Sequence, residues 1–80
     1  MSKEFPAMNY RKVAKIAKHL GFYLARTAKG SHEIWRRDSD GRQTTIPNHG
    51  PRDINKRTVK TIFSDLNISL RELEKILNEI

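Results

Sequence analysis

Three histidines, His19, His32 and His49, are the side chains of this sequence best suited to exchange a proton near neutral pH. Two of them flank Asp40-Gly41, a dipeptide typical of a hairpin turn, so their strands should run antiparallel. If paired residue numbers sum to 81, His32 lies opposite His49, and if they sum to 79 the two are diagonal neighbours. In either register both share one face, with Cβ atoms about 5–8 Å apart.

This juxtaposition depends on the turn, because a one-residue slip would place His32 and His49 on opposite faces of the sheet. Pro47 and Gly50 also interrupt a regular strand, so His49 could leave the ladder. His19, in contrast, is expected near the C-terminal end of a helix, where a cationic side chain suits the helix dipole.

Two histidines on one open face could supply the base and the acid for cleavage of a phosphodiester bond. RNA carries its own nucleophile, the 2′-hydroxyl, so the protein need add only these groups and positive charge for the developing oxyanion. Such a reaction requires no metal ion or other cofactor. Arg26 and Lys29 could stabilise the charge, being close to His32 in the predicted hairpin. The alternative is that both histidines are ordinary surface or structural residues.

Other residues near these histidines are candidates for binding RNA. Gly30 and Ser31 are expected to shape the backbone before His32 and to present amide groups. Ser31 cannot easily pair with His32, because neighbours on a strand point to opposite faces. Lys56 and Arg57 begin a predicted helix and could bind a phosphate with its free amides, or form only a solvated basic end. The histidines lack the helical i, i+4 spacing of metal ligands, and the one carboxylate next to them, Glu33, is expected on the opposite face of the strand, so no metal site is predicted.

The elements that would position these residues follow from hydrophobic periodicity and capping signals. Apolar residues at helical spacing predict a helix over 10–20 after a cap at Asn9, a second after a cap at Asn55, and a third that begins with the capping box Ser69–Glu72. Strands are predicted over 22–27, 31–37 and 42–47, with a polar loop over 48–53. The expected fold class is α+β, a three-stranded antiparallel sheet covered on one face by helices. Residues 1–80 should form one domain, with 1–8 a loose leader that contains Pro6.

The composition limits the kinds of molecule that this protein can be expected to bind and the compartment in which it is expected. Sixteen Lys and Arg against nine Asp and Glu give a net charge of +7, which favours a polyanion such as nucleic acid, although an acidic protein remains an alternative. The absence of cysteine excludes disulfides and favours a reducing cytoplasm. No apolar run resembles a signal peptide or approaches the roughly 18 residues of a membrane span. We therefore expect a cytoplasmic protein without a membrane partner.

Several segments together resemble the HicA toxin family, also called YcfA-like. The resemblance is carried by Gly21-Phe22 through Arg26, by Gly30-Ser31-His32, and by Ile46-Pro47-Asn48-His49. Further matches are Thr58-Val59-Lys60-Thr61-Ile62 and Asn67-Ile68-Ser69, and the opening Phe5-Pro6-Ala7 is similar to longer members. The resemblance covers nearly the whole chain, and Gly-Ser-His followed by Pro-x-His is its most specific part.

The resemblance implies a fold similar to double-stranded-RNA-binding domains. It also implies a metal-independent endoribonuclease, an mRNA interferase of a type II toxin–antitoxin system, neutralised by a HicB-type antitoxin. His32 corresponds to the family's catalytic histidine and His49 to its downstream histidine. Members often carry glycine at the positions of Arg57 and Asn67. Asn67 tolerates the left-handed conformation, whereas Arg57 removes flexibility at a helix start and adds charge there. The alternative function is a non-catalytic basic RNA-binding module of the same fold.

Overall fold

The computed structural model describes residues 5–80, which form a sheet and helices in the predicted order, with two short strands added. The elements are β1 (Met8–Asn9), α1 (Tyr10–His19), β2 (Tyr23–Thr27), β3 (His32–Arg36), β4 (Gln43–Pro47), β5 (Asp53–Ile54), α2 (Lys56–Asp65) and α3 (Leu70–Glu79). Strands β2, β3 and β4 form an antiparallel sheet in that order, and β1 pairs with β5. The predicted α+β class is confirmed, and no described helix is long and apolar enough to cross a membrane.

Each helix begins at the polar residue that the sequence indicates as its cap. The side chains of Asn9 and Asn55 accept backbone N–H groups of the first turns of α1 and α2, at 3.0 and 2.8 Å. The capping box of Ser69 and Glu72 is complete at the start of α3. Asn67 follows α2 with a φ of 60°, a left-handed conformation that asparagine tolerates. The caps therefore satisfy backbone groups that would otherwise lack partners.

The register of β3 and β4 determines which side chains face outward. His32 lies opposite Pro47 and Trp35 opposite Thr44, the register in which paired numbers sum to 79. Along β3, Glu33 and Trp35 are buried whereas His32 and Arg36 are exposed. The open face of the sheet therefore carries His32, and the inner face contributes Trp35 to the core.

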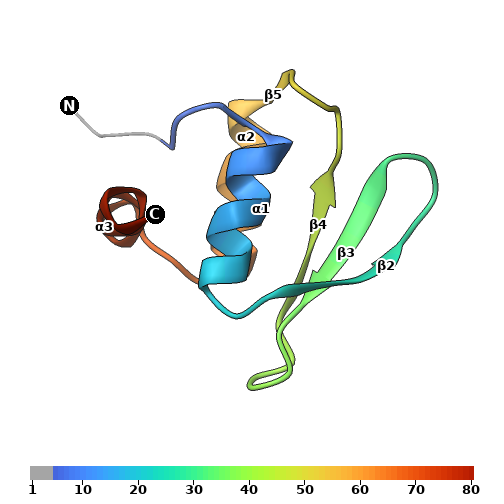
Figure 1. Cartoon of the computed structure of the whole chain (residues 1–80), viewed down its shortest axis with the longest axis horizontal. Helices are drawn as coiled ribbons and strands as arrows, with labels where there is room; N and C mark the ends of the chain where they lie inside the picture. The colour runs from blue at the N-terminus through green and yellow to red at the C-terminus, as the bar shows by residue number, and fades with distance from the viewer. Residues whose placement is uncertain (1–4) are drawn as a thin grey trace.

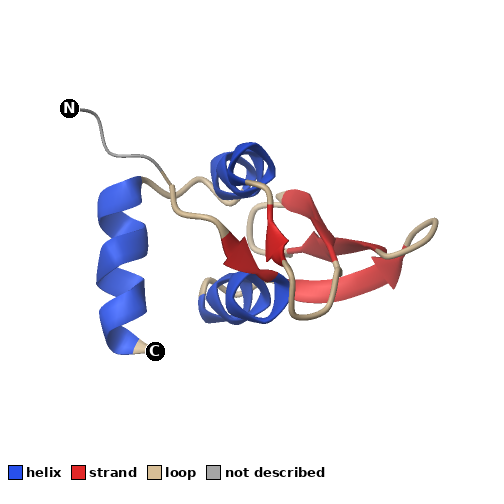
Figure 2. Ribbon diagram, turned by 90° about the horizontal axis from the view of Figure 1, so that it is seen from above, coloured by secondary structure: helices blue, strands red, loops and turns tan. Residues whose placement is uncertain are grey.

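Helices α1 and α2 pack side by side against the inner face of the sheet, near β4 (Figures 1 and 2). Helix α3 lies on the far side of this pair, where it packs against α1 and buries Leu73 and Ile76 (Figure 2). The prediction that helices cover one face of the sheet is thus confirmed, and α1 and α2 are the helices that lie against it. The apolar stripe of α3 packs against α1 instead.

The N-terminal segment is not the loose leader predicted for residues 1–8, at least over its described part. Residues 1–4 lie outside the described residues. The ring of Phe5 packs on Phe63 with centroids 5.3 Å apart, and Met8 is buried and pairs with Ile54. Pro6 opposes regular structure only locally, so it does not prevent its apolar neighbours from reaching the core. Likewise Asp53, expected in a loop, begins β5.

We predict that Met8→Ala lowers the free energy of unfolding by about 2–4 kcal/mol, because it removes buried methylene groups and leaves a cavity. Urea denaturation followed by circular dichroism would measure the change. The exposed Lys15→Ala on α1 is the control and should stay within about 0.5 kcal/mol of wild type. A Met8→Ala value as small as that of the control would show that burial of the Met8 side chain contributes nothing measurable to stability.

Candidate active site

His32 is the first residue of β3 and is exposed on the open face of the sheet. Gly30, in the turn before it, has a φ of 70°, and no atom lies near the position of a Cβ there. Backbone conformation, rather than crowding, therefore favours glycine at this position. The turn is closed by a hydrogen bond of 2.7 Å from the Ala28 amide to the His32 carbonyl. Ser31 is also exposed, so Gly30 and Ser31, the two residues before His32, both lie at the surface.

His49 lies outside the sheet, in the loop that joins β4 to β5. Strand β4 ends at Pro47, and one further backbone contact, from the Asn48 amide to the Ser31 carbonyl at 2.9 Å, holds the loop against the start of β3. Direct pairing of His32 with His49 is therefore excluded, and the diagonal register holds up to the end of β4. Both histidines are exposed, so a ligand in solvent can reach either ring.

A buried carboxylate lies on the inner side of β3, directly after His32. Glu33 is only 9% exposed and accepts a hydrogen bond from the Trp35 indole N–H at 3.0 Å. The Asn48 side-chain amide donates to its second oxygen at 3.5 Å. Burial, together with a hydrogen bond from its hydroxyl to Glu33, raises the pKa of Tyr10 to about 12. Strand alternation predicts that Glu33 and His32 point to opposite faces of the sheet, but nothing in the sequence indicates which groups donate hydrogen bonds to Glu33.

The predicted cationic residues are all exposed. Arg26 on β2 lies opposite Ile34, which is two residues from His32, so Arg26 shares the open face with the histidine. Lys29 is in the turn between β2 and β3, and Lys56 and Arg57 begin α2. This turn, the β4–β5 loop and the start of α2 lie toward the same end of the molecule (Figure 1). We refer to this end as the histidine end.

The opposite end of the sheet differs in charge, because its cations are paired. In the β3–β4 turn, the Arg37 guanidinium donates to both carboxylate oxygens of Asp40, at 3.1 and 2.7 Å. These hydrogen bonds hold the pKa of Asp40 at about 2, well below its usual range. Arg36 lies 3.5 Å from Asp38, and Arg42 lies 3.5 Å from Asp40. The positive charge available to a polyanion is therefore concentrated away from this turn.

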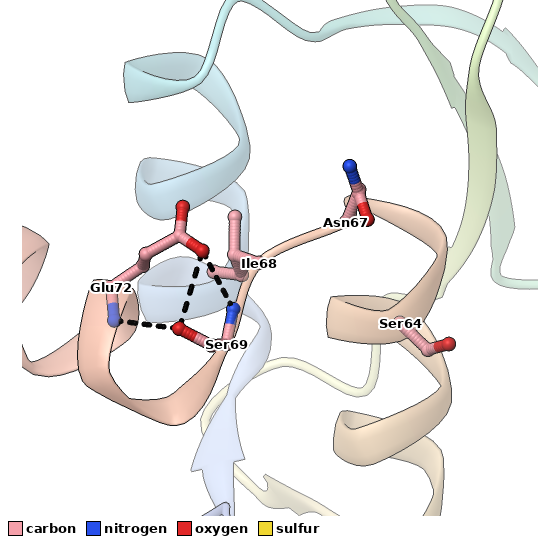
Figure 3. A pocket seen from close by; sticks show the side chains of 5 residues that line it. All are labelled: Ser64, Asn67, Ile68, Ser69 and Glu72. Carbon is pink, nitrogen blue, oxygen red and sulfur yellow. Dashed lines mark hydrogen bonds between the residues drawn. The ribbon is translucent and has the colours of Figure 1, made fainter.

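A hollow of about 340 Å³ lies elsewhere, between the end of α2 and the start of α3 (Figure 3). It is lined by Ser64, Asn67, Ile68, Ser69 and Glu72. The Glu72 carboxylate is engaged in the capping box that Figure 3 draws. None of the predicted site residues contributes to this hollow. Among residues 5–80, no three His, Asp or Glu side chains gather as ligands for a metal ion.

The chain matches the model of a known protein family. The family model described as HicA toxin of bacterial toxin-antitoxin matches residues 10–68, whereas no curated protein matches the chain. The matched region contains α1, the whole β2–β3–β4 sheet and α2, together with every predicted site residue, and leaves out α3. The resemblance seen in the sequence is therefore confirmed over well more than half of its length. The chain belongs to the HicA toxin family of bacterial toxin–antitoxin systems.

Proposed function

We propose that this toxin is a metal-independent endoribonuclease, an mRNA interferase, in which His32 is a catalytic acid or base and His49 assists. The observation that carries the proposal is the place of His32: exposed, on the open face of the sheet, and at the end of the molecule where Lys29, Lys56 and Arg57 are also exposed. The family match adds that Gly30-Ser31-His32 belongs to a HicA domain.

The proposed reaction uses the RNA's own nucleophile. One histidine removes the proton of a 2′-hydroxyl, whose oxygen attacks the adjacent phosphorus. The bond from phosphorus to the 5′-oxygen then breaks, and the other histidine gives that oxygen a proton. The products are a 2′,3′-cyclic phosphate and a free 5′-hydroxyl. Each positioned acid or base typically contributes about 10²- to 10⁴-fold to such a rate.

Positive groups around His32 would bind the RNA and stabilise the pentacoordinate phosphorane. Arg26 shares its face, while Lys29 and the amides of Gly30 and Ser31 precede it in the turn. Lys56 and Arg57, at the N-terminal end of α2, would hold a more distant phosphate, because free amides and the helix dipole favour an anion there.

The same proposal implies an antitoxin as the protein partner and the cytoplasm as the compartment. A HicB-type antitoxin would neutralise the toxin by covering the face that carries His32, and an acidic surface would suit the +7 charge of this chain. A sequence without cysteine suits the reducing cytoplasm, where mRNA is also found.

We predict that the purified protein cleaves a structured RNA in EDTA and that His32→Ala lowers the rate by about 10²- to 10⁴-fold. The loss follows because no other side chain can exchange a proton at that position. Gel electrophoresis of end-labelled RNA would measure it. His19→Ala is the matched control: its imidazole lies 3.5 Å from Glu79 of α3, and the variant should cleave as wild type does.

Intact RNA with both wild type and His32→Ala, in folded samples that still bind RNA, would contradict the enzymatic proposal. It would favour the non-catalytic RNA-binding module. RNA binding that is absent or insensitive to salt would instead favour a domain whose basic surface serves an acidic protein, because phosphate contacts weaken steeply as salt rises.

A second prediction concerns the cations. In a His32→Ala background, which keeps the RNA intact, Arg26→Ala should weaken RNA binding and reduce the slope of log K against log salt by about 0.7–0.9. The reason is that one fewer phosphate contact releases one fewer counterion. Fluorescence anisotropy at several salt concentrations would measure this. Lys75→Ala on α3 removes the same charge away from the site and should leave the slope unchanged.

The third prediction tests the partner. An acidic antitoxin encoded next to this toxin should co-purify with it, abolish RNA cleavage and protect His32 from acylation by diethyl pyrocarbonate. Mass spectrometry of the modified peptide would report the protection, with His19 as the reference histidine. A partner that binds but leaves His32 as reactive as before would contradict occlusion of the site.

A further inference from the structure

We propose that Glu33 and Asn48 are positioning residues that hold the loop of His49 against the part of β3 that begins with His32. The proposal rests on the proposed function for its catalytic consequence, but its structural part stands on the contacts of these two residues. Neither residue would touch the RNA's reacting atoms. Their role is to determine where the second histidine lies.

Asn48 contacts the chain on both sides of His32. Its amide donates to the Ser31 carbonyl at 2.9 Å, and its side-chain amide donates to Glu33 at 3.5 Å. Its side-chain oxygen accepts the Gly50 amide at 3.1 Å, so the same residue also closes the backbone around His49. Asn48 is thus bonded to both neighbours of one histidine and adjoins the other.

Glu33 connects this loop to the core. Its side chain is buried, one oxygen accepts the indole N–H of Trp35 at 3.0 Å, and the hydroxyl of Tyr10 also donates to it. Trp35 is 1% exposed and Tyr10 begins α1, so two elements of the core fix the carboxylate. Three donors converge on Glu33, which therefore serves as an acceptor.

The contacts of Asn48 take over from the backbone pairing of β3 and β4 at the point where β4 ends. Strand β4 stops at Pro47, which has no amide to donate, and Gly50 turns the chain away with a φ of 67°. Beyond Pro47, the contacts of Asn48 are what hold the loop to β3. The separation of the two imidazoles accordingly depends on these two contacts, and the Glu33–Asn48 contact is the one that a side-chain substitution can remove.

The test exchanges the donor and the acceptor of the Glu33–Asn48 hydrogen bond by two substitutions. Asn48→Asp keeps an oxygen for the Gly50 amide, but it removes the donor to Glu33 and sets a second carboxylate against the first. Adding Glu33→Gln to that variant supplies a new donor and restores a complementary pair. Gln43→Glu is the matched control, since it makes the same change of charge at an exposed site at the other end of β4.

Two measurements are made on each variant. NMR records the ring and backbone signals of His49 and the solvent exchange of the Gly50 amide, and RNA cleavage gives kcat and KM. We expect Asn48→Asp to shift the His49 signals and to lower kcat by about 10- to 100-fold with little change in KM. The Gly50 amide keeps its acceptor in this variant and should exchange as it does in wild type. The double variant should recover both the signals and kcat. A purely structural loss would not recover in this way.

The proposal would be overturned if Asn48→Asp had the same His49 signals and the same kcat as Gln43→Glu. It would also be overturned if the double variant recovered neither the His49 signals nor kcat relative to Asn48→Asp. Should Asn48→Asp fail to fold, Asn48→Ala removes the donor to Glu33 without adding charge, together with the acceptor of the Gly50 amide, and should likewise shift the His49 signals and lower kcat. If wild type cleaves no RNA at all, the proposed function fails, and the His49 signals alone decide whether Asn48 positions the loop.

Discussion

The burial of Trp35 on the inner face of β3 is the constraint from which the geometry of the site follows. An aromatic side chain that removes 150–250 Å² from water contributes at most about 4–6 kcal/mol. Because side chains alternate along a strand, fixing Trp35 inward fixes Glu33 inward and His32 outward. A slip of one residue would exchange these environments, and its cost explains why the histidine is reliably at the surface.

The two ends of the sheet have different electrostatic roles. At the β3–β4 turn, Arg37 bonds to Asp40 and also donates to the Leu20 carbonyl at 2.8 Å, so its charge joins the turn to the end of α1. At the histidine end, Lys29, Lys56 and Arg57 are exposed, and nothing neutralises the charge to a similar degree in the described structure. A polyanion is attracted by such an asymmetric field and approaches in a preferred orientation.

Much of this architecture could be predicted from the sequence, because its signals are local. Helical periodicity and the caps Asn9, Asn55 and Ser69 placed the helices, and the turn at Asp40 placed the strands to within about a residue. The HicA family was also recognisable from short motifs. The exposure of His32 followed from strand alternation alone.

The remainder depends on contacts between distant segments. The β1–β5 ladder could not be predicted, since strands of two residues show no periodicity. The buried partners of Glu33 were missed for a related reason: a glutamate on a strand resembles a surface residue until Tyr10 and Asn48 are brought to it. The position of α3 behind the other helices depends on which element packs against its apolar face. An amphipathic pattern shows that a helix has such a face but does not identify the element that covers it.

The β1–β5 ladder has a consequence for the order in which the chain can fold. Met8 pairs with Ile54, so the segment closed by this pair includes α1, all of the main sheet and both site histidines. Closing so long a loop costs more chain entropy than forming the two hairpins inside it. The hairpins can therefore form early, whereas the ladder must wait until Ile54 has left the ribosome. Until then the loop that carries His49 is held only at its β4 end, so its conformation is completed late in folding.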